Sequence, residues 1–136
     1  MAGRLRLSVT RLARQLRQQS DAGLSPSQLS ALASIDLHGP LTLGALAEHE
    51  RVAAPSVTKV VAKLEAAGLV RRELDADDRR IAWASSTAAG SALLAKVRQR
   101  KTAWLAARLA GLDDDERRRL AAALDVLDAL TKKSPA

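Results

Sequence analysis

The chain has 136 residues, of which 47% are hydrophobic, and its formal net charge is +7, from 22 basic and 15 acidic side chains. This length suits one domain with one core, and a composition rich in Ala and Leu favours helices over a sandwich or barrel. The chain contains no cysteine, which excludes disulfides, thiolate metal sites and a thiol redox switch. The excess of basic over acidic side chains favours a polyanionic partner, either nucleic acid or an anionic membrane surface.

The N-terminal segment, residues 1–20, carries a helical apolar stripe among several arginines. A basic amphipathic helix can lie on a membrane or pair with a second copy of itself, and the absence of Trp and Phe anchors favours pairing. No apolar run approaches the ~20 residues of a membrane span, and no signal peptide is evident, so we expect a cytoplasmic protein that does not bind membranes. The stripe expected at a homodimer interface consists of Leu5, Val9, Leu12 and Leu16.

Two short helices are predicted next. Residues 25–28 form a capping box with proline at the first helical position, and Gly39-Pro40 ends the helix that they begin. Thr42 is suited to cap a third helix, from Leu43 to about His49, and Arg51 and Val52 form the turn that follows it.

The segment from Pro55 to Ala67 has the clearest pattern in the chain. Its apolar residues recur at the i, i+3, i+4, i+7 spacing of one helix face, which must pack inward. The opposite face combines small residues, hydroxyls and cations, which suits a helix that enters a DNA major groove. The alternative is a solvated face with no partner. The inward residues are Val57, Val60, Val61 and Leu64, and the candidate DNA contacts are Pro55, Ser56, Thr58, Lys59 and Lys63.

A basic β-hairpin is predicted directly after this helix. Gly68 is suited to end the helix, and strands at residues 69–74 and 81–85 flank a polar turn. Arg79 and Arg80 follow this turn and suit contact with phosphates and a DNA minor groove, where negative potential is concentrated. Asp78 can support Arg80 through a local ion pair. A solvated hairpin that makes only such pairs is the alternative.

The C-terminal third is predicted to be helical. Thr87 is expected to cap a long helix that reaches about Ala110, and Asp113 and Glu116 have the spacing of a second capping box. A carboxylate metal site at residues 113–116 is the weaker alternative. The last helix carries a narrow apolar seam suited to a partner helix, which comprises Leu120, Leu124 and Leu127.

The sequence contains few residues or motifs that are suited to catalysis or metal binding. His38 and His49 are the chain's two histidines, so a metal site would need added carboxylates such as Glu48 or Glu50. We expect no metal, no cofactor and no enzyme, because neither a nucleophile motif nor a glycine-rich phosphate loop is present. Trp83 is expected to anchor the wing to the body of the protein rather than to touch DNA. Trp104 is expected to pack in the dimer interface or the core, with an effector cleft as the alternative.

The run from Val52 to Thr87 resembles the winged helix-turn-helix of the MarR (multiple antibiotic resistance regulator) family. The resemblance is carried by the P-S-V-T-K start of the recognition helix, its L-E-x-x-G-L-V-x-R end, the D-x-R wing and the closing S-T-x-x-G. The chain departs from the family pattern at two places. Ala53-Ala54 stands where the family commonly opens the helix on Ser or Thr, and Ser86 stands where an apolar residue is usual.

The resemblance implies a mainly α fold with a small β-hairpin wing (α+β), with six helices in a single domain over residues 1–136. Residues 42–87 would bind DNA, and residues 1–20 and 88–131 would supply dimerisation helices. The function implied is a sequence-specific transcriptional regulator that binds double-stranded DNA as a homodimer on a pseudo-palindromic operator, as a repressor that responds to a small-molecule effector. A winged-helix protein-interaction module, or a small-molecule sensor with nonspecific DNA contact, remains an alternative. The expected DNA contacts are Pro55, Ser56, Thr58, Lys59, Lys63, Arg79, Arg80, Thr42 and Arg51.

Overall fold

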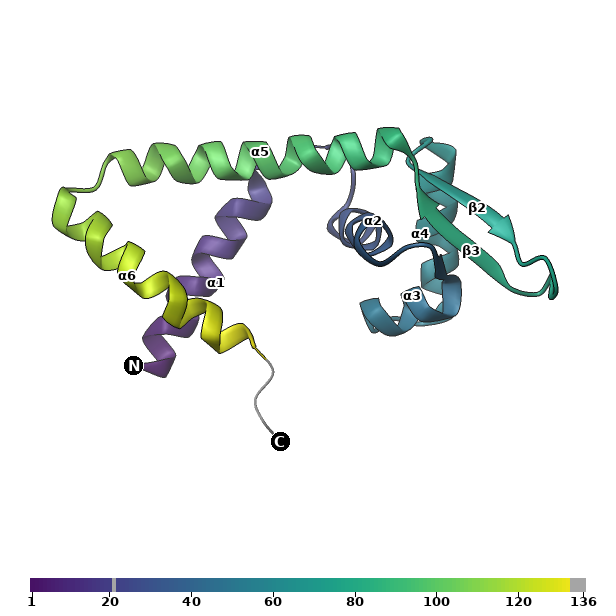
Figure 1. The fold of residues 1–136 in the computed structure, drawn as a ribbon, viewed down its shortest axis with the longest axis horizontal. Coiled ribbons are helices and arrows are strands. Elements are labelled where there is room, and N and C mark those ends of the chain that lie inside the picture. The colour runs from purple at the N-terminus through teal and green to yellow at the C-terminus, as the bar shows by residue number, and fades with distance from the viewer. Residues whose placement is uncertain (21, 133–136) are drawn as a thin grey trace. The chain divides into compact units, whose positions relative to one another are not determined.

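The computed structural model describes residues 1–20 and 22–132 (Figure 1). Within these residues the chain forms six helices and a small antiparallel sheet, which confirms the predicted mainly α, winged helix-turn-helix fold. No helix in the described residues is both long and apolar enough to cross a membrane. The elements are α1 (Ala2–Gln18), α2 (Pro26–His38), β1 (Leu41–Thr42), α3 (Leu43–Glu50), α4 (Ala54–Ala66), β2 (Val70–Leu74), β3 (Ala82–Ser86), α5 (Ala88–Ala110) and α6 (Asp114–Thr131).

The chain forms two compact units, Met1–Lys101 and a second that starts at Thr102. The first unit contains α1 to α4, the sheet and most of α5. The second contains the end of α5 and all of α6. The functional division predicted from the sequence, with DNA binding in residues 42–87 and dimerisation in residues 1–20 and 88–131, stays a prediction.

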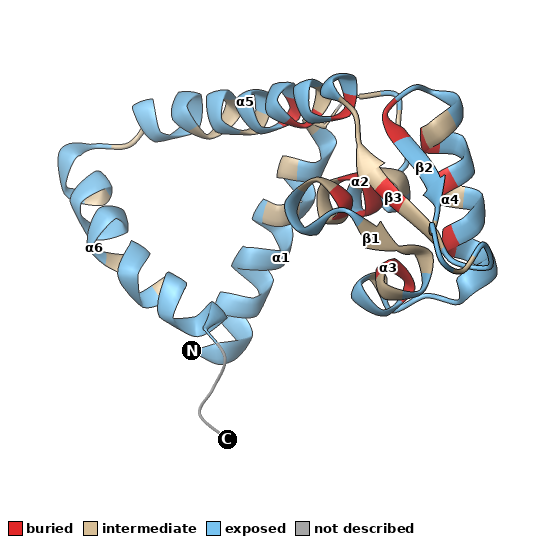
Figure 2. Ribbon diagram, turned by 45° about the vertical axis from the view of Figure 1, so that its right-hand side comes forward, coloured by how far each residue is buried: buried red, intermediate tan, exposed pale blue. Residues whose placement is uncertain are grey.

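The buried core lies in the first unit, between α2, α3, α4, the sheet and the start of α5 (Figure 2). Neither α1 nor α6 has a buried residue, so their apolar stripes are not part of this core. The predicted inward faces of the second, third and fourth helices supply its centre. The largest fully buried side chains are Leu32, Ile35, Leu46, Leu64 and Val61.

The helix starts follow the predicted caps. Ser25 and Asp113 each form a complete capping box, and the side chain of Thr42 accepts a hydrogen bond from Ala45 N at 3.0 Å. The start of α4 differs, because Ala53 at its N-cap has no side chain that can accept one. The helix begins at Ala54, one residue before the predicted start.

The sheet has three antiparallel strands in the order β1-β3-β2. The predicted hairpin forms its larger part, with Val70 opposite Ser86 and Leu74 opposite Ala82, and each strand begins one residue later than predicted. The additional strand, β1, pairs Thr42 with Trp83. Strand β1 was not predicted, because a two-residue strand is too short to show a period-2 pattern.

The hairpin is fixed to the start of α5 by close backbone contacts. Gly68 has a φ of +75°, as predicted for a glycine that ends a helix. The hydroxyl of Thr87 donates to Gly68 O at 2.7 Å and accepts from Gly90 N at 3.1 Å. A Cβ on Gly90 would collide with the carbonyl oxygen of Leu69, so only glycine allows this approach. These contacts hold α4, β2 and α5 together at one junction.

Candidate nucleic-acid interface

Helix α4 presents its cations outward, as its sequence pattern predicts. The side chains of Val57, Val61 and Leu64 are 3%, 0% and 0% exposed, so the face with these residues is packed against the core. Lys59 and Lys63 lie on the exposed side, and neither forms an ion pair with any described residue. Two free ammonium groups on one exposed helix face are available to an anionic partner.

The first turn of α4 presents small polar side chains. Pro55 and Ser56 are exposed, and each is free to approach a surface closely. The hydroxyl of Thr58 donates to the carbonyl oxygen of Ala54 at 3.1 Å, within its own helix. Thr58 therefore has no second proton to donate to a phosphate oxygen unless it gives up this bond.

Two predicted contact residues flank α3, with Thr42 at its N-cap and Arg51 at its C-cap. Thr42 is half-buried and its hydroxyl oxygen caps α3, although its O–H remains able to donate outward. Arg51 is exposed and adopts the left-handed conformation with φ 55°, which is uncommon for a residue other than glycine. This conformation ends α3 and turns the chain toward α4.

The wing presents two exposed arginines beside an aspartate. The carboxylate of Asp78 accepts from Nε and Nη2 of Arg80, each at 3.0 Å, and from the backbone N of Arg80 at 3.0 Å. These hydrogen bonds lower the pKa of Asp78, chiefly through the guanidinium, and Asp78 in turn raises the pKa of Arg80. The predicted pair therefore forms, while 91% of the Arg80 side chain stays exposed. Arg79 is exposed and forms no ion pair with a described residue.

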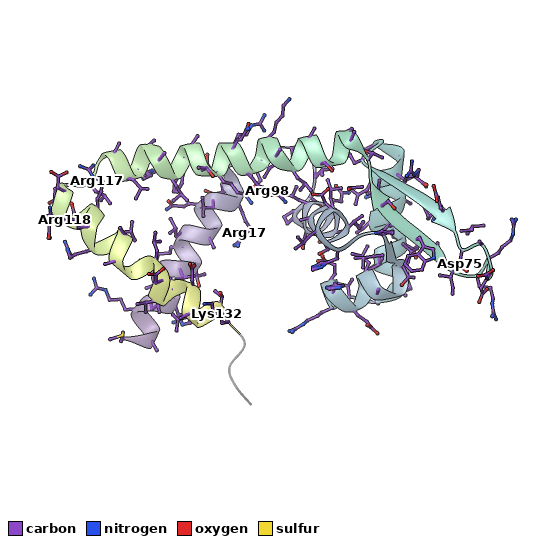
Figure 3. The ribbon with its side chains drawn as sticks, viewed as in Figure 1. Arg17, Asp75, Arg98, Arg117, Arg118 and Lys132 are labelled. Carbon is purple, nitrogen blue, oxygen red and sulfur yellow. The ribbon has the colours of Figure 1, made fainter. Side chains whose placement is uncertain are left out.

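Asp75 organises the wing loop, a role that our sequence analysis did not assign to it. It lies where β2 ends (Figure 3). Its carboxylate accepts from Trp83 Nε1 at 2.9 Å and from the backbone N of Asp77 and Asp78 at 3.0 and 2.9 Å. These bonds, that of Trp83 first, lower the pKa of Asp75. The sequence signal was the aspartate-rich run itself, because such side chains commonly bond the backbone two or three residues on. The hydrogen bond of the Trp83 side chain is therefore made within the wing, and the expected anchoring of the wing to the body by Trp83 stays a prediction.

Asp36 on α2 joins three elements and was also missed. It accepts from Ser86 Oγ of β3 at 2.8 Å and from Ser91 Oγ of α5 at 2.6 Å. The bond from Ser91 has the largest effect in lowering the pKa of Asp36, followed by that from Ser86. The polar Ser86, which departs from the family pattern, is thus accommodated by a hydrogen bond. Partners that lie 50 and 55 positions away leave no local signal in the sequence.

His38, His49 and Trp104 are the residues with alternative predicted roles at a metal or effector site, and each has an aromatic or cationic neighbour. The rings of His38 and His49 stack with centroids 4.7 Å apart. The described residues contain no cluster of three or more metal-ligating side chains. Arg108 Cζ lies 4.6 Å from the ring centroid of Trp104, so the two form a cation–π contact within the second unit.

The candidate dimerisation residues are exposed or half-buried, and no described residue covers them fully. Leu5, Val9 and Leu12 on α1 are 36%, 51% and 46% exposed, and Leu16 is half-buried. On α6, Leu120 and Leu124 are 39% and 52% exposed, and Leu127 is half-buried. Each helix therefore carries an apolar stripe that its own unit leaves uncovered.

The sequence and fold match known transcriptional regulators. The pattern of the MarR family matches residues 24–82. The chain is 42% identical to the uncharacterized HTH-type transcriptional regulator Mb0904 of Mycobacterium bovis, over 99% of this chain and 95% of that protein. It is 32% identical to the HTH-type transcriptional repressor MdtR of Bacillus subtilis, over 74% of this chain and 65% of MdtR. A candidate transcriptional regulator from Pseudomonas aeruginosa, at 36% identity, superposes with a TM-score of 0.83 and covers 98% of this chain and 94% of its own. The chain therefore belongs to the MarR family of HTH-type transcriptional regulators.

Proposed function

We propose that the protein is a cytoplasmic repressor, rather than an enzyme, that binds a pseudo-palindromic operator as a homodimer and responds to a small-molecule effector. The observation that carries the proposal is the outward face of α4, where Lys59 and Lys63 are exposed and form no ion pair with a described residue. The arginine-bearing wing belongs to the same compact unit, so one unit offers two basic elements to one duplex. The repressor role is supported by the likeness to MdtR, which is named as a repressor.

In this proposal α4 enters the major groove and the wing contacts the adjacent minor groove. Small side chains at the start of α4 allow close approach, and the lysines reach phosphates or base edges. The wing arginines enter the narrower groove, where negative potential is strongest. Arg51 lies at the turn before α4 and would contact the DNA backbone. The proposed contacts are Pro55, Ser56, Thr58, Lys59, Lys63, Arg79, Arg80, Thr42 and Arg51.

The proposed dimer uses the uncovered apolar stripes of α1 and α6. Burying such stripes against a second copy would remove apolar surface from water, which is the main driving force for association. Two-fold symmetry then places two copies of α4 one DNA turn apart, at about 34–36 Å, and this spacing predicts two half-sites in the operator. The residues proposed for this interface are Leu5, Val9, Leu12, Leu16, Leu120, Leu124 and Leu127.

The effector response is supported by a cavity in the first unit. It has a volume of about 260 Å³ and is lined in part by Arg17, Ser20 and Lys101. The Ser20 hydroxyl is buried and makes no hydrogen bond with the described residues. An effector that releases the repressor from DNA must bind more tightly to the conformation that has a low affinity for DNA, because the affinities for ligand and DNA are linked.

The decisive experiment is a titration of a fluorescent duplex from the region upstream of the protein's own coding sequence, with a scrambled duplex as control, at several salt concentrations. We expect a preference of at least ~10³ for the specific duplex, as sequence-specific regulators show. A salt-dependent affinity without preference would instead indicate a sensor with nonspecific DNA contact. No affinity for either duplex would indicate a protein-interaction module. Both results would reject the proposal.

A further inference from the structure

A second cavity lies in the first unit, lined by residues of α2, α3, α4 and the turn between α3 and α4. It has a volume of about 330 Å³, which is within the range of small-molecule sites. Its apolar walls include Ala31 of α2, Leu46 of α3 and Val60 of α4. Figure 2 shows buried positions on α2, α3 and α4, the elements that enclose it. Polar side chains, among them Ser27, Ser30 and Glu50, complete the lining.

Glu50 is the only acidic residue that lines this cavity, and its charge is not neutralised by a described residue. The carboxylate is half-buried and accepts from Ser30 Oγ at 2.8 Å and from Ser34 Oγ at 2.7 Å. It forms no ion pair within the described residues. A carboxylate can accept about four hydrogen bonds, so two hydroxyl donors leave it capacity for more.

This arrangement favours a ligand with a positive charge. A partly buried carboxylate is stabilised by an opposite charge at hydrogen-bond distance, and a serine hydroxyl supplies no charge. The two serine bonds hold the carboxylate at the cavity in a fixed orientation. A ligand with an ammonium group and a compact apolar body would satisfy both the carboxylate and the apolar walls at once.

We propose that this cavity binds a small organic cation, with its ammonium group on Glu50 and its apolar body against Val57 and Val60. The inference rests on the proposed function, because it gives the effector response a ligand class and a second site, apart from the cavity at Arg17 and Lys101. Val57 and Val60 belong to α4, and Ser56, one of the proposed DNA contacts on the same helix, also lines the cavity. A ligand in the cavity therefore touches the helix that reads DNA, and any preference for one position of α4 changes DNA affinity.

The test is an NMR titration of the full chain with phenethylammonium, using 2-phenylethanol as a neutral counterpart of similar shape. We expect saturable shifts of the amides of Glu50, Val57 and Val60, which line this cavity and not the one at Arg17 and Lys101, with phenethylammonium. Glu50→Gln should weaken the binding of the cation by about tenfold or more, as the loss of a charged hydrogen bond implies, and leave that of 2-phenylethanol unchanged. Glu48→Gln is the matched control, because Glu48 is exposed on α3 and does not line the cavity.

A second variant keeps the test independent of Glu50. Ser27 is exposed at the cavity, so Ser27→Phe can fill the space without displacing the core, and it should weaken binding of both probes. Shifts confined to the surroundings of Arg17 and Lys101, or an affinity for phenethylammonium that Glu50→Gln leaves unchanged, would overturn the proposal.

The duplex titration separates this proposal from the proposed function. If the probe binds at the cavity while the protein shows no preference for its upstream duplex, the site stands and the repressor function fails. If the specific duplex binds and no probe shifts the cavity amides, the function stands and the cation site is rejected.

Discussion

The ion pair between Asp78 and Arg80 contributes more to the orientation of the Arg80 side chain than to the stability of the fold. Exposed ion pairs contribute little to stability, because water and salt screen them. The fork between the two side chains uses Nε and Nη2 of Arg80 and leaves Nη1 available to another acceptor. A guanidinium held in this way loses less rotational freedom when it binds a phosphate or a sugar oxygen.

Replacing Arg80 with alanine should weaken DNA binding without unfolding the protein. One cationic contact is lost, so the slope of log affinity against log salt should fall by about 1. The melting curve should not change, because the side chain is 91% exposed. Lys96→Ala is the control, since Lys96 is an exposed cation on α5 outside the proposed contacts. Equal affinities for Arg80→Ala and wild type would reject the wing assignment.

Replacing Asp75 with alanine should loosen the wing loop alone. The backbone N–H groups of Asp77 and Asp78 lose their acceptor, so their amide exchange should accelerate by roughly an order of magnitude. Hydrogen exchange followed by NMR measures this directly. Asp77→Ala is the matched control, because no described residue forms a hydrogen bond or ion pair with the Asp77 carboxylate. Unchanged exchange in Asp75→Ala would show that the loop is held by other contacts.

At the scale of elements, α4 is positioned by packing rather than by its own start signal. Its N-cap residue, Ala53, has the extended backbone geometry of a capping residue, with φ −68° and ψ 146°, but lacks the side-chain oxygen. The helix nevertheless forms, because Val57, Val61 and Leu64 bury its inner face. Packing therefore outweighs a missing cap here, since burying one such side chain contributes about 1.5–3 kcal/mol.

Restoring the cap should stabilise the protein. Ala53→Ser supplies an acceptor for the free N–H groups of the first turn, and we expect a gain of about 1 kcal/mol. The gain is measured as a higher midpoint of urea unfolding. Ala54→Ser is the control, because Ala54 lies inside the helix and cannot cap it. Equal midpoints for both variants would show that Ala53 does not act as a cap position.

Asp36 joins α2 to β3 and α5 through hydrogen bonds, and its contribution to the free energy of unfolding should depend on pH. Its pKa is lowered in the folded state from an ordinary value of 3.8, so the unfolded chain binds the proton more readily. The stabilisation is therefore fully present above about pH 4 and is lost as the pH falls through the lower folded pKa. Asp36→Asn should be less stable than wild type by about 1 kcal/mol at pH 7, and the difference should shrink toward pH 3.

Urea unfolding at pH 7, 5 and 3 measures this difference. Asp125→Asn is the control, because Asp125 is an exposed residue of α6 with no hydrogen bond or ion pair to a described residue. A gap between wild type and Asp36→Asn that stays constant down to pH 3 would contradict the assignment.

At the scale of the whole molecule, the sequence predicted the parts whose signals are local. Apolar spacing identified the inward face of α4, and caps such as Ser25 and Asp113 marked helix starts. The strand β1 and the bonds of Asp36 were missed, because they depend on residues distant in sequence that folding brings together. For the candidate site, the pairing of Arg80 was predictable from two nearby residues, whereas the acceptor for Trp83 was not identified.

At this scale, the proposed specific binding of DNA depends on the proposed homodimer. Leu124, 52% exposed on α6, lies at the centre of the proposed interface stripe. Leu124→Glu would place a charge in that interface, and burying an unpaired charge is strongly unfavourable. We expect the variant to sediment as a monomer at concentrations where wild type is a dimer. Leu37→Glu, at a leucine 75% exposed on α2, is the matched control and should remain dimeric.

Loss of the dimer should also weaken operator binding in a predictable way. A monomer engages one half-site, so it loses the advantage of a linked second contact, which is about 10²–10⁴ in affinity. Because each half-site interaction is intact, a duplex with a single half-site should bind Leu124→Glu and wild type similarly. This comparison separates a dimerisation defect from damage to the DNA-reading unit. If Leu124→Glu stays dimeric, α6 does not form the interface; if it is monomeric and still binds the full operator tightly, specific binding does not require two copies.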